Sequence, residues 1–143
     1  MHALNQLLKH ASSDNYYKGK SDIAGDGIFA SKDLPVTTTV ALALTPGDDD
    51  EYGSKVYNLT DAARFCNHQT KANCQIKKNE DGNFNIVTIK TVPQDKELTV
   101  DYRQVARAIG PGSRMQWEGK DIPTTDFSDY VEKEACKKGN NRG

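Results

Sequence analysis

Apolar residues follow two different spacings along this chain. Near the N-terminus, Leu4, Leu7, Leu8 and Ala11 recur three and four residues apart, and this spacing predicts an amphipathic helix over residues 3–11. From residue 16 onward, the apolar positions form short runs that are rich in β-branched residues and bounded by Gly, Pro or Asp, which is typical of strands. The predicted strands cover residues 28–30, 37–45, 75–78, 84–92 and 97–102.

Turn and cap residues separate these predicted strands. Residues 79–82 read Asn-Glu-Asp-Gly, so the strands on either side of them are expected to form a hairpin. Thr60 or Asp61 can cap a helix of one or two turns over residues 62–65. Residues 126–135 could form a C-terminal helix that precedes a frayed tail. The pattern predicts a mainly β domain with short helices at both ends.

Length and charge narrow the class of protein. The 143 residues correspond to one domain. With 19 basic and 20 acidic residues, the net charge is −1, which argues against direct nucleic-acid binding because such proteins usually carry a basic excess. No apolar stretch approaches the roughly 18 residues of a membrane helix, and no signal peptide opens the chain. We therefore expect no membrane contact and a protein of the cytoplasm or nucleus.

Residues 48–51 are four acidic residues in a row. A run of like charges is usually a solvated loop, and we favour that interpretation. The alternative is a docking surface for a basic partner.

The cysteines argue against metal binding and disulfides. Cys66, Cys74 and Cys136 form no closely spaced pair, and the three His residues of the chain do not complete a four-ligand zinc site. So sparse a set also argues against a disulfide framework. We expect three reduced thiols and no metal.

Three segments carry candidate chemistry when they are taken together. They read GDGIFA at residues 25–30, RFCNHQTKANC at 64–74 and ELTVDY at 97–102. Taken singly, each has an ordinary interpretation, namely a tight turn, a locally bonded Asn-His pair and a tyrosine at the end of a strand. Their order and spacing are more specific than any one of them.

This combination resembles the SET-domain family of protein lysine methyltransferases, over about residues 23–102 and more loosely to residue 117. The residues that match the family signature are Gly25, Gly27, Ile28, Phe29, Arg64, Phe65, Asn67, His68, Asn73, Glu97, Leu98, Thr99, Asp101 and Tyr102. The resemblance implies a β-clip of small curved sheets in which the Asn-His segment and the segment ending in Tyr102 thread together as a pseudoknot. It divides the chain into an N-terminal helical clip over residues 1–15, the SET domain over 16–108 and a closing segment and tail over 109–143.

The family places cofactor and substrate on opposite faces that are joined by a narrow channel. Carried over, the residues implied to hold S-adenosylmethionine, which leaves as S-adenosylhomocysteine, are Gly25, Asp26, Gly27, Ile28, Arg64, Asn67, His68, Tyr102 and Trp117. The residues expected to line the substrate channel are Phe65, Val100, Tyr52 and Tyr57. Tyr102 is the expected catalytic residue, because its hydroxyl can align the amine with the methyl group. Trp117 either covers the adenine or anchors the tail.

The chain departs from the family at Thr70, where many members carry a zinc-binding Cys, and it lacks the C-terminal cysteines of that site. It therefore looks like a minimal, stand-alone member of the viral or bacterial kind, whose site closes without metal. For a viral protein of a eukaryote, the host nucleus becomes a second expected location.

The expected function is S-adenosylmethionine-dependent methylation of a lysine in a protein or peptide substrate, which is expected to be basic, and a homodimer is compatible with it. One alternative is a SET-like module that binds a basic peptide without catalysis. Another is an unrelated β-clip domain for a small ligand, which would leave the Asn-His and ELTVDY segments unexplained.

Overall fold

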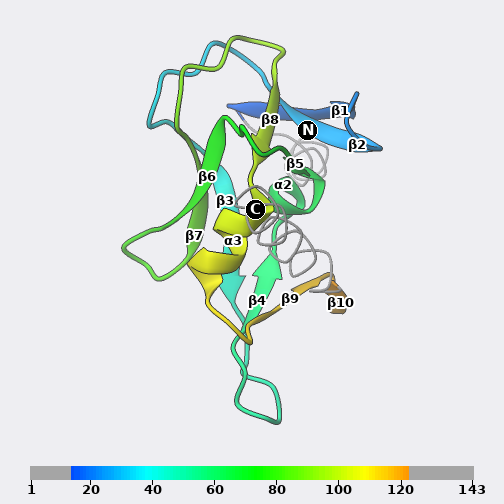
Figure 1. Ribbon diagram of the computed structural model, residues 1–143, viewed down its shortest axis with the longest axis vertical. Coiled ribbons are helices and arrows are strands. Elements are labelled where there is room, and N and C mark those ends of the chain that lie inside the picture. Colours follow the sequence, from blue (N-terminus) through cyan, green and yellow to red (C-terminus); the bar gives the residue numbers. More distant parts are fainter. Residues whose placement is uncertain (1–13, 123–143) are drawn as a thin grey trace, which may run out of the picture.

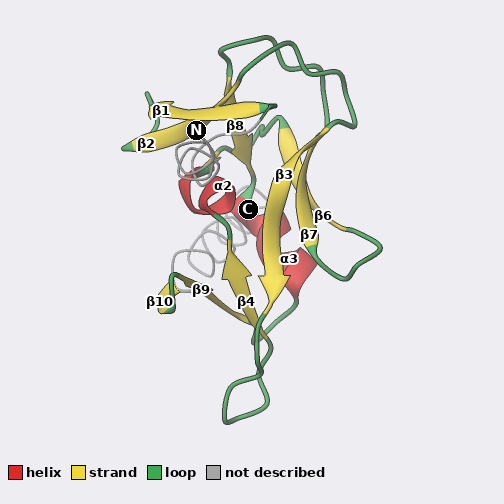
Figure 2. Ribbon diagram, turned by 180° about the vertical axis from the view of Figure 1, so that it is seen from behind, coloured by secondary structure: helices red, strands yellow, loops and turns green. Residues whose placement is uncertain are grey.

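The computed structural model describes residues 14–122, so the predicted helices over residues 3–11 and 126–135 and the predicted tail lie outside the described part of the chain. Within that part, the chain forms a mainly β fold with two short helices (Figures 1 and 2). In chain order the elements are β1 (Tyr16–Lys20), β2 (Asp26–Ala30), β3 (Thr39–Pro46), β4 (Val56–Leu59), α2 (Asp61–Phe65), β5 (Asn67–His68), β6 (Cys74–Lys78), β7 (Phe84–Thr88), β8 (Glu97–Val100), α3 (Tyr102–Ile109), β9 (Arg114–Trp117) and β10 (Lys120–Ile122).

The strands join in a mixed sheet in the order β1-β2-β8-β6-β7-β3-β4-β9-β10, and β5 is attached to β8. The pairs β4 with β9, β5 with β8 and β6 with β8 are parallel. The remaining pairs are antiparallel, among them the predicted hairpin of β6 and β7. The mainly β, SET-type fold expected from the sequence is confirmed.

Strand β8 is the point where the three motif segments meet. On one side, Leu98 of β8 pairs with Ile28 of β2, which follows the glycine turn. On the other side, Thr99 pairs in parallel with Asn67 of β5, and Val100 pairs with Cys74 of β6. Residues 67–74 therefore contact the same short strand at both of their ends.

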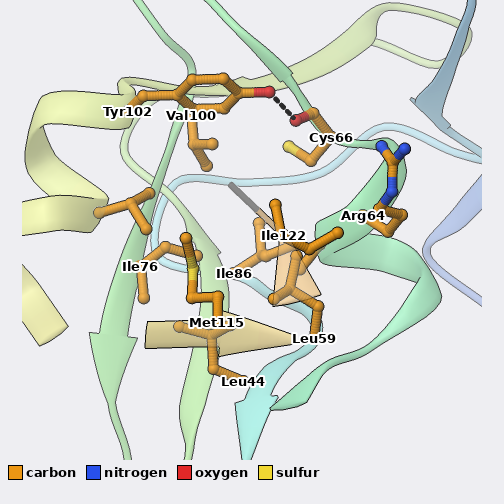
Figure 3. Close-up of a pocket in the computed structure, with 12 residues that line it drawn as sticks. Leu44, Leu59, Arg64, Cys66, Ile76, Ile86, Val100, Tyr102, Met115 and Ile122 are labelled. Atoms are coloured by element: carbon orange, nitrogen blue, oxygen red, sulfur yellow. Dashed lines mark hydrogen bonds between the residues drawn. The ribbon is translucent and has the colours of Figure 1, made fainter. Parts of the chain in front are cut away.

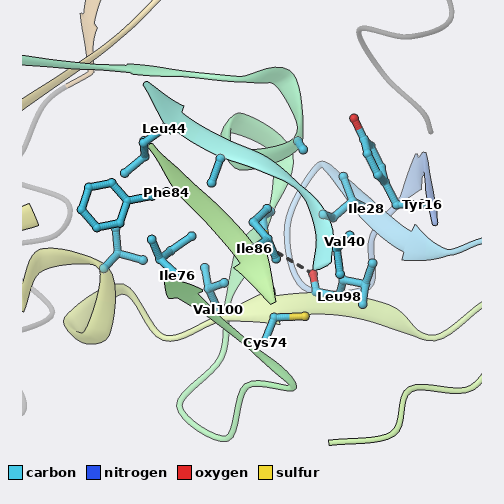
Figure 4. Close-up of a cluster of buried hydrophobic side chains, with 14 of the residues drawn as sticks. Tyr16, Ile28, Val40, Leu44, Cys74, Ile76, Phe84, Ile86, Leu98 and Val100 are labelled. Carbon is cyan, nitrogen blue, oxygen red and sulfur yellow. Dashed lines mark hydrogen bonds between the residues drawn. The ribbon is translucent and has the colours of Figure 1, made fainter. Parts of the chain in front are cut away.

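The core forms from the inward faces of these strands (Figure 4). Ile28, Leu44, Ile86 and Leu98, from four different strands, are essentially inaccessible to water. Burial of each such side chain contributes about 1.5–3 kcal/mol to stability relative to leaving it exposed. Because Leu98 of β8 belongs to this core, the core fixes the position of β8 relative to the neighbouring strands.

Both helices begin and end as local physical chemistry dictates. The Thr60 hydroxyl, one of the two predicted caps, accepts the Ala63 N–H and caps α2. The Asp101 carboxylate accepts the Arg103 N–H and caps α3. Gly110 ends α3 with a φ of 87°, a positive value that glycine adopts without a steric cost.

The structure corrects the predicted end of the ELTVDY strand. β8 stops at Val100, and Tyr102 is the first residue of α3 rather than the last residue of a strand. The prediction was wrong because alternation of apolar residues continues through the cap, whereas the Asp101 side chain turns the backbone into a helix.

Other predicted strand limits also change. β3 begins at Thr39, because Thr37 adopts a φ of 67°, and β7 ends at Thr88 rather than at residue 92. The sequence did not predict β1, β4, β5, β9 or β10, nor the helix α3. The strands β4, β9 and β10 are short, and β4 pairs in parallel with β9, which lies 58 residues further along the sequence.

Cys66 and Cys74 are free and buried, while Cys136 lies outside the described residues. Within residues 14–122, no group of three or more His, Cys, Asp or Glu side chains is arranged to hold a metal ion. No helix in the same range has the length and apolar character needed to cross a membrane.

Candidate functional site

The side-chain amide of Asn67 lies in a cluster of oxygen acceptors. Its Nδ2 atom is 2.9 Å from Glu97 Oε2, 3.0 Å from Ser21 Oγ, 3.0 Å from the Ala24 carbonyl and 3.3 Å from the Asp26 carbonyl. An amide has two hydrogens, so this cluster offers more acceptors than Asn67 can use at one time. The predicted Asn67 and the turn at residues 24–27 are therefore brought together.

Gly27 leaves room for the carboxylate that completes this cluster. A Cβ atom at position 27 would lie 2.3 Å from Glu97 Oε2 and 3.0 Å from Glu97 Cδ. Both carboxylate oxygens of Glu97 lie 2.8 Å from the Ser21 hydroxyl, which donates to them. The second glycine of the motif is thus required by Glu97, in addition to any role in approaching a ligand.

Asn73, the last polar residue of the Asn-His motif, fixes β8 from the other side. Its Oδ1 accepts the Thr99 N–H at 2.9 Å, and its Nδ2 donates to the Glu97 carbonyl at 2.8 Å. The buried side chain supplies the two bonds that a neighbouring strand would supply. These two bonds therefore help to fix the position of Glu97 relative to the glycine turn.

Tyr102 is held at both ends. Its backbone N–H donates to Nδ1 of His68 at 2.9 Å, and the two rings lie 5.0 Å apart. Its hydroxyl donates to the Cys66 carbonyl at 3.2 Å. The His68 ring thus hydrogen-bonds locally, at the first turn of α3.

A small apolar pocket of about 80 Å³ opens beside the Tyr102 hydroxyl (Figure 3). Its wall is built by residues from α2, α3 and several strands. They are Leu44, Leu59, Ala63, Arg64, Cys66, Ile76, Ile86, Val100, Tyr102, Val105, Met115 and Ile122. Figure 3 shows the Tyr102 hydroxyl and the Cys66 carbonyl facing each other above the apolar side chains.

Two ionisable groups at or beside this pocket, Cys66 and Asp101, have shifted pKa values. Burial, and then the proximity of Cys74 and Glu97, raises the pKa of the Cys66 thiol well above its usual value. Burial alone would raise the pKa of the Asp101 carboxyl, but the hydrogen bonds and charge of Arg103 outweigh it and lower that pKa. Cys66 is thus a neutral thiol near pH 7, and Asp101 is a charged cap.

The outer face of α2 carries a stack of aromatic and basic side chains. The rings of Phe65 and Trp117 meet edge to face at 6.0 Å. Lys18 Nζ lies 4.3 Å above the Phe65 ring, and the Arg64 guanidinium lies 5.4 Å from the Trp117 ring. Trp117 also donates its Nε1–H to Asp61 at 3.0 Å, so it is anchored on α2.

The structure separates the predicted channel residues. Of these, Val100 lines the pocket together with Tyr102, whereas Phe65 belongs to the stack outside it. Tyr57 is 8% exposed and packs against Phe84 in the core. Tyr52 is 84% exposed in the loop between β3 and β4, which projects at the bottom of Figure 1. Neither tyrosine lines the pocket.

The acidic run in this loop is only partly solvated. Asp50 Oδ1 accepts the N–H groups of Tyr52 and Ser54, and Asp50 Oδ2 pairs with Arg114 at 3.1 Å. The bond from Ser54 is the largest cause that lowers the pKa of this carboxyl. Asp50 therefore shapes the loop and ties it to β9.

Sequence reasoning did not assign functional-site roles to Ser21 or Glu97. Glu97 was visible as a motif residue, but its contact with Gly27 and Asn67 depends on the pairing of β2 with β8. Ser21 belongs to none of the three motif segments, so nothing in the sequence indicated its role. In the structure, its Oγ also caps the turn by accepting the N–H groups of Ile23 and Ala24.

A comparison with known protein families supports the resemblance to the SET domain. The model of the SET domain matches residues 44–103, which includes the Asn-His and ELTVDY segments but not the glycine turn. No curated protein matches the chain.

Among solved structures, a candidate histone methyltransferase of Plasmodium falciparum aligns over 64% of this chain and 95% of its own, with 15% identity and a TM-score of 0.48. A humanized mutant of Chaetomium thermophilum Polycomb Repressive Complex 2, bound to an inhibitor, aligns over 64% of this chain and 15% of its own, with 19% identity and a TM-score of 0.50. At 19% identity, the similarity to the second structure indicates a shared fold only. The TM-score of 0.48 for the first structure is too low to support a conclusion. With the family-model match and the observed fold, the resemblance of this chain to the SET-domain family of protein lysine methyltransferases is confirmed.

Proposed function

We propose that this chain is an S-adenosylmethionine-dependent protein-lysine N-methyltransferase with Tyr102 as its catalytic residue. One observation carries the proposal. The carbonyl of Cys66 meets the Tyr102 hydroxyl at the pocket, while the side chain of the next residue, Asn67, reaches the glycine turn. Consecutive Cα atoms are about 3.8 Å apart, so the two candidate sites are built on adjacent residues of one short segment. This proximity suits a reaction between ligands on opposite faces.

The oxygen cluster around Asn67 fits a cationic ligand. Ala24 and Asp26 contribute carbonyl oxygens, and Glu97 contributes a carboxylate. A Cβ at Gly25 would meet nothing within 4 Å, so the turn is open on that side. When bound, S-adenosylmethionine supplies a methyl group on a sulfonium that is already activated for displacement. Asn67 and residues 25–28 would hold it, together with Arg64, His68 and Trp117 as the resemblance implies.

Tyr102 would act by alignment. Its backbone is held by the bond from its N–H to His68, and its ring lies against the His68 ring. The hydroxyl is directed at the Cys66 carbonyl by the hydrogen bond that it donates there. Two oxygens at a fixed separation can orient an incoming amine without reorganising in the transition state.

The pocket would favour the neutral form of the substrate lysine. A free lysine has a pKa of about 10.4, so only about 1 in 2,500 is neutral at pH 7, a deficit of about 4.6 kcal/mol. Apolar walls such as Ile76, Ile86 and Val100 lower that pKa by disfavouring the charged amine. Because burial raises the pKa of the Cys66 thiol well above its usual value, Cys66 keeps its proton. We therefore expect the lysine to lose its own proton to water rather than to this side chain.

The substrate class that fits is a lysine within a protein or peptide. We keep the expectation that residues 109–143 close the site. The described part of that segment supports it, because Met115 and Ile122 line the pocket. The cellular location stays a prediction.

The test combines labelled cofactor with mass spectrometry of lysate proteins, followed by kinetics on the modified substrate. Tyr102→Phe should lower turnover at least roughly tenfold, or about 1.4 kcal/mol, with unchanged cofactor affinity. The matched control is Tyr17→Phe, whose hydroxyl donates to Asp95 away from the pocket. Near wild-type turnover of Tyr102→Phe would remove Tyr102 from the mechanism. Cofactor or peptide binding without any transfer would favour the inactive module instead.

A further inference from the structure

Strand β6 extends beyond the end of its neighbour β8. The two strands pair only through Cys74 and Val100, because the chain turns at Asp101 and enters α3. Ile76, two residues further along β6, stands opposite Ile86 of β7 on the other edge. Its own N–H and carbonyl therefore need partners on the side that β8 has left.

Gln104 of α3 supplies both partners. Its Oε1 accepts the Ile76 N–H at 2.8 Å, and its Nε2 donates to the Ile76 carbonyl at 2.8 Å. A primary amide offers one acceptor and a donor in nearly the geometry of a peptide group. The side chain thus takes the place of the residue that a longer β8 would have provided.

This contact lies in the first turn of α3, which begins with Tyr102. Gln104 is two residues after Tyr102, and Ile76 lines the same pocket as the tyrosine ring (Figure 3). His68 holds the start of the helix from one side, and the Gln104 amide holds it from the other. A helix held at these two points cannot rotate or slide without breaking a bond.

We propose that Gln104 is a positioning residue that fixes α3 against β6 in the register that directs the Tyr102 hydroxyl to the Cys66 carbonyl. Gln104 lies beyond residues 44–103, the span matched by the SET domain model. Its importance for catalysis rests on the proposed methyltransferase function, while its effect on the tyrosine does not.

Two substitutions separate positioning from simple stabilisation. Gln104→Leu removes both hydrogen bonds. Gln104→Glu keeps an acceptor for the Ile76 N–H, but at neutral pH it turns a carboxylate toward the Ile76 carbonyl. Gln94→Glu is the matched control, because Gln94 is exposed and lies in the turn before β8. We expect both Gln104 variants to lose about tenfold or more in turnover per folded molecule, as small misplacements do, with unchanged cofactor affinity.

The pH profile distinguishes the two variants. Once the introduced carboxyl group of Gln104→Glu is protonated, it can again donate to the Ile76 carbonyl and accept its N–H. The turnover of Gln104→Glu relative to wild type should therefore recover as the pH falls from 8 toward the pKa of the introduced carboxyl, which is about 4.3 for a free glutamate and higher where burial disfavours the charged form. The relative turnover of Gln104→Leu should stay flat over that range. Recovery to the same extent in both variants would contradict the proposed hydrogen bonds.

A measurement without turnover keeps the inference independent of the enzymatic function. In protein labelled with carbon-13 at the tyrosine Cζ, the Tyr102 signal is identified by its loss in Tyr102→Phe. We expect that signal to shift in Gln104→Leu and to stay in place in Gln94→Glu, with the signal of buried Tyr57 unchanged in both. A folded Gln104→Leu protein with the wild-type Tyr102 signal would overturn the inference. If the wild type transfers no methyl group, the proposed function fails and this shift still decides the role of Gln104.

Discussion

Replacing Gly27 with alanine tests how the motif residues depend on one another. The new Cβ would overlap Glu97 Oε2 at 2.3 Å and lie 3.1 Å from Ser21 Cβ. The carboxylate would have to leave, although it is the end of a flexible side chain, and its hydrogen bonds with Ser21 and Asn67 would break.

The magnitude follows from those bonds. Hydrogen bonds to a charged group contribute about 1.5–3 kcal/mol each, part of which is regained when a half-buried carboxylate is rehydrated. Replacing glycine by alanine also restricts the unfolded chain, which stabilises the fold by about 0.4–1 kcal/mol. We therefore expect Gly27→Ala to lower the free energy of unfolding by about 1–3 kcal/mol.

The assay is urea unfolding followed by the fluorescence of Trp117, the single tryptophan of the chain. In a Glu97→Ala background, Gly27→Ala should cost at least about 1 kcal/mol less, because the clash is gone. Gly25→Ala is the control. Its φ of 45° makes alanine costly by about 1–2 kcal/mol, but nothing lies within 4 Å of its Cβ, so that cost should be the same in both backgrounds.

Equal losses for Gly27→Ala with and without the Glu97 side chain would refute the reasoning. The second glycine would then owe its place to backbone conformation or to a ligand rather than to the carboxylate.

Two further predictions concern stability at high pH and cofactor binding. Burial raises the pKa of the Cys74 thiol from 9.0 to about 12, so the folded state keeps a proton that the unfolded state releases, and stability should fall as pH rises through that window. Cys74→Ala should reduce the slope of the unfolding free energy against pH by up to about 1.4 kcal/mol per pH unit. Urea unfolding of wild type and variant from pH 9 to 11 measures the two slopes, and equal slopes would mean that the thiol is exposed. Asn67→Ala should weaken binding of S-adenosylmethionine more than Phe65→Leu does, because it leaves the turn carbonyls and Glu97 without their donor. The expected loss is about 1–3 kcal/mol, and a calorimetric affinity of Asn67→Ala equal to that of wild type would contradict this prediction.

Local signals in the sequence predicted the parts of the fold that depend on neighbouring residues. The Asp-Gly turn and the cap at Thr60, one of the two candidates, each act on atoms a few residues away, so they can be recognised without the tertiary structure. The same holds for the strand that follows Gly27, since alternation and bounding turns are local.

The candidate site shows where such signals stop. The motifs named Asn67 and Tyr102, and the structure places Asn67 at the glycine turn and Tyr102 at the pocket. For the second channel tyrosine, the sequence offered Tyr52 and Tyr57, but exposure separates them into a loop residue and a core residue. Nothing in the residues around either one indicates which it will be.

The sequence by itself determined which residue types stand in the motifs and roughly where the strands begin. Only the tertiary structure decided that Glu97 fills the space beside Gly27, that Ser21 donates to a carboxylate 76 residues away and that Gln104 completes the edge of β6. The physical reason is that these contacts exist only after β2, β6 and α3 have been assembled around β8. A side-chain amide or a missing Cβ carries no local pattern, since its effect depends on a partner that the folded sheet brings within about 3 Å.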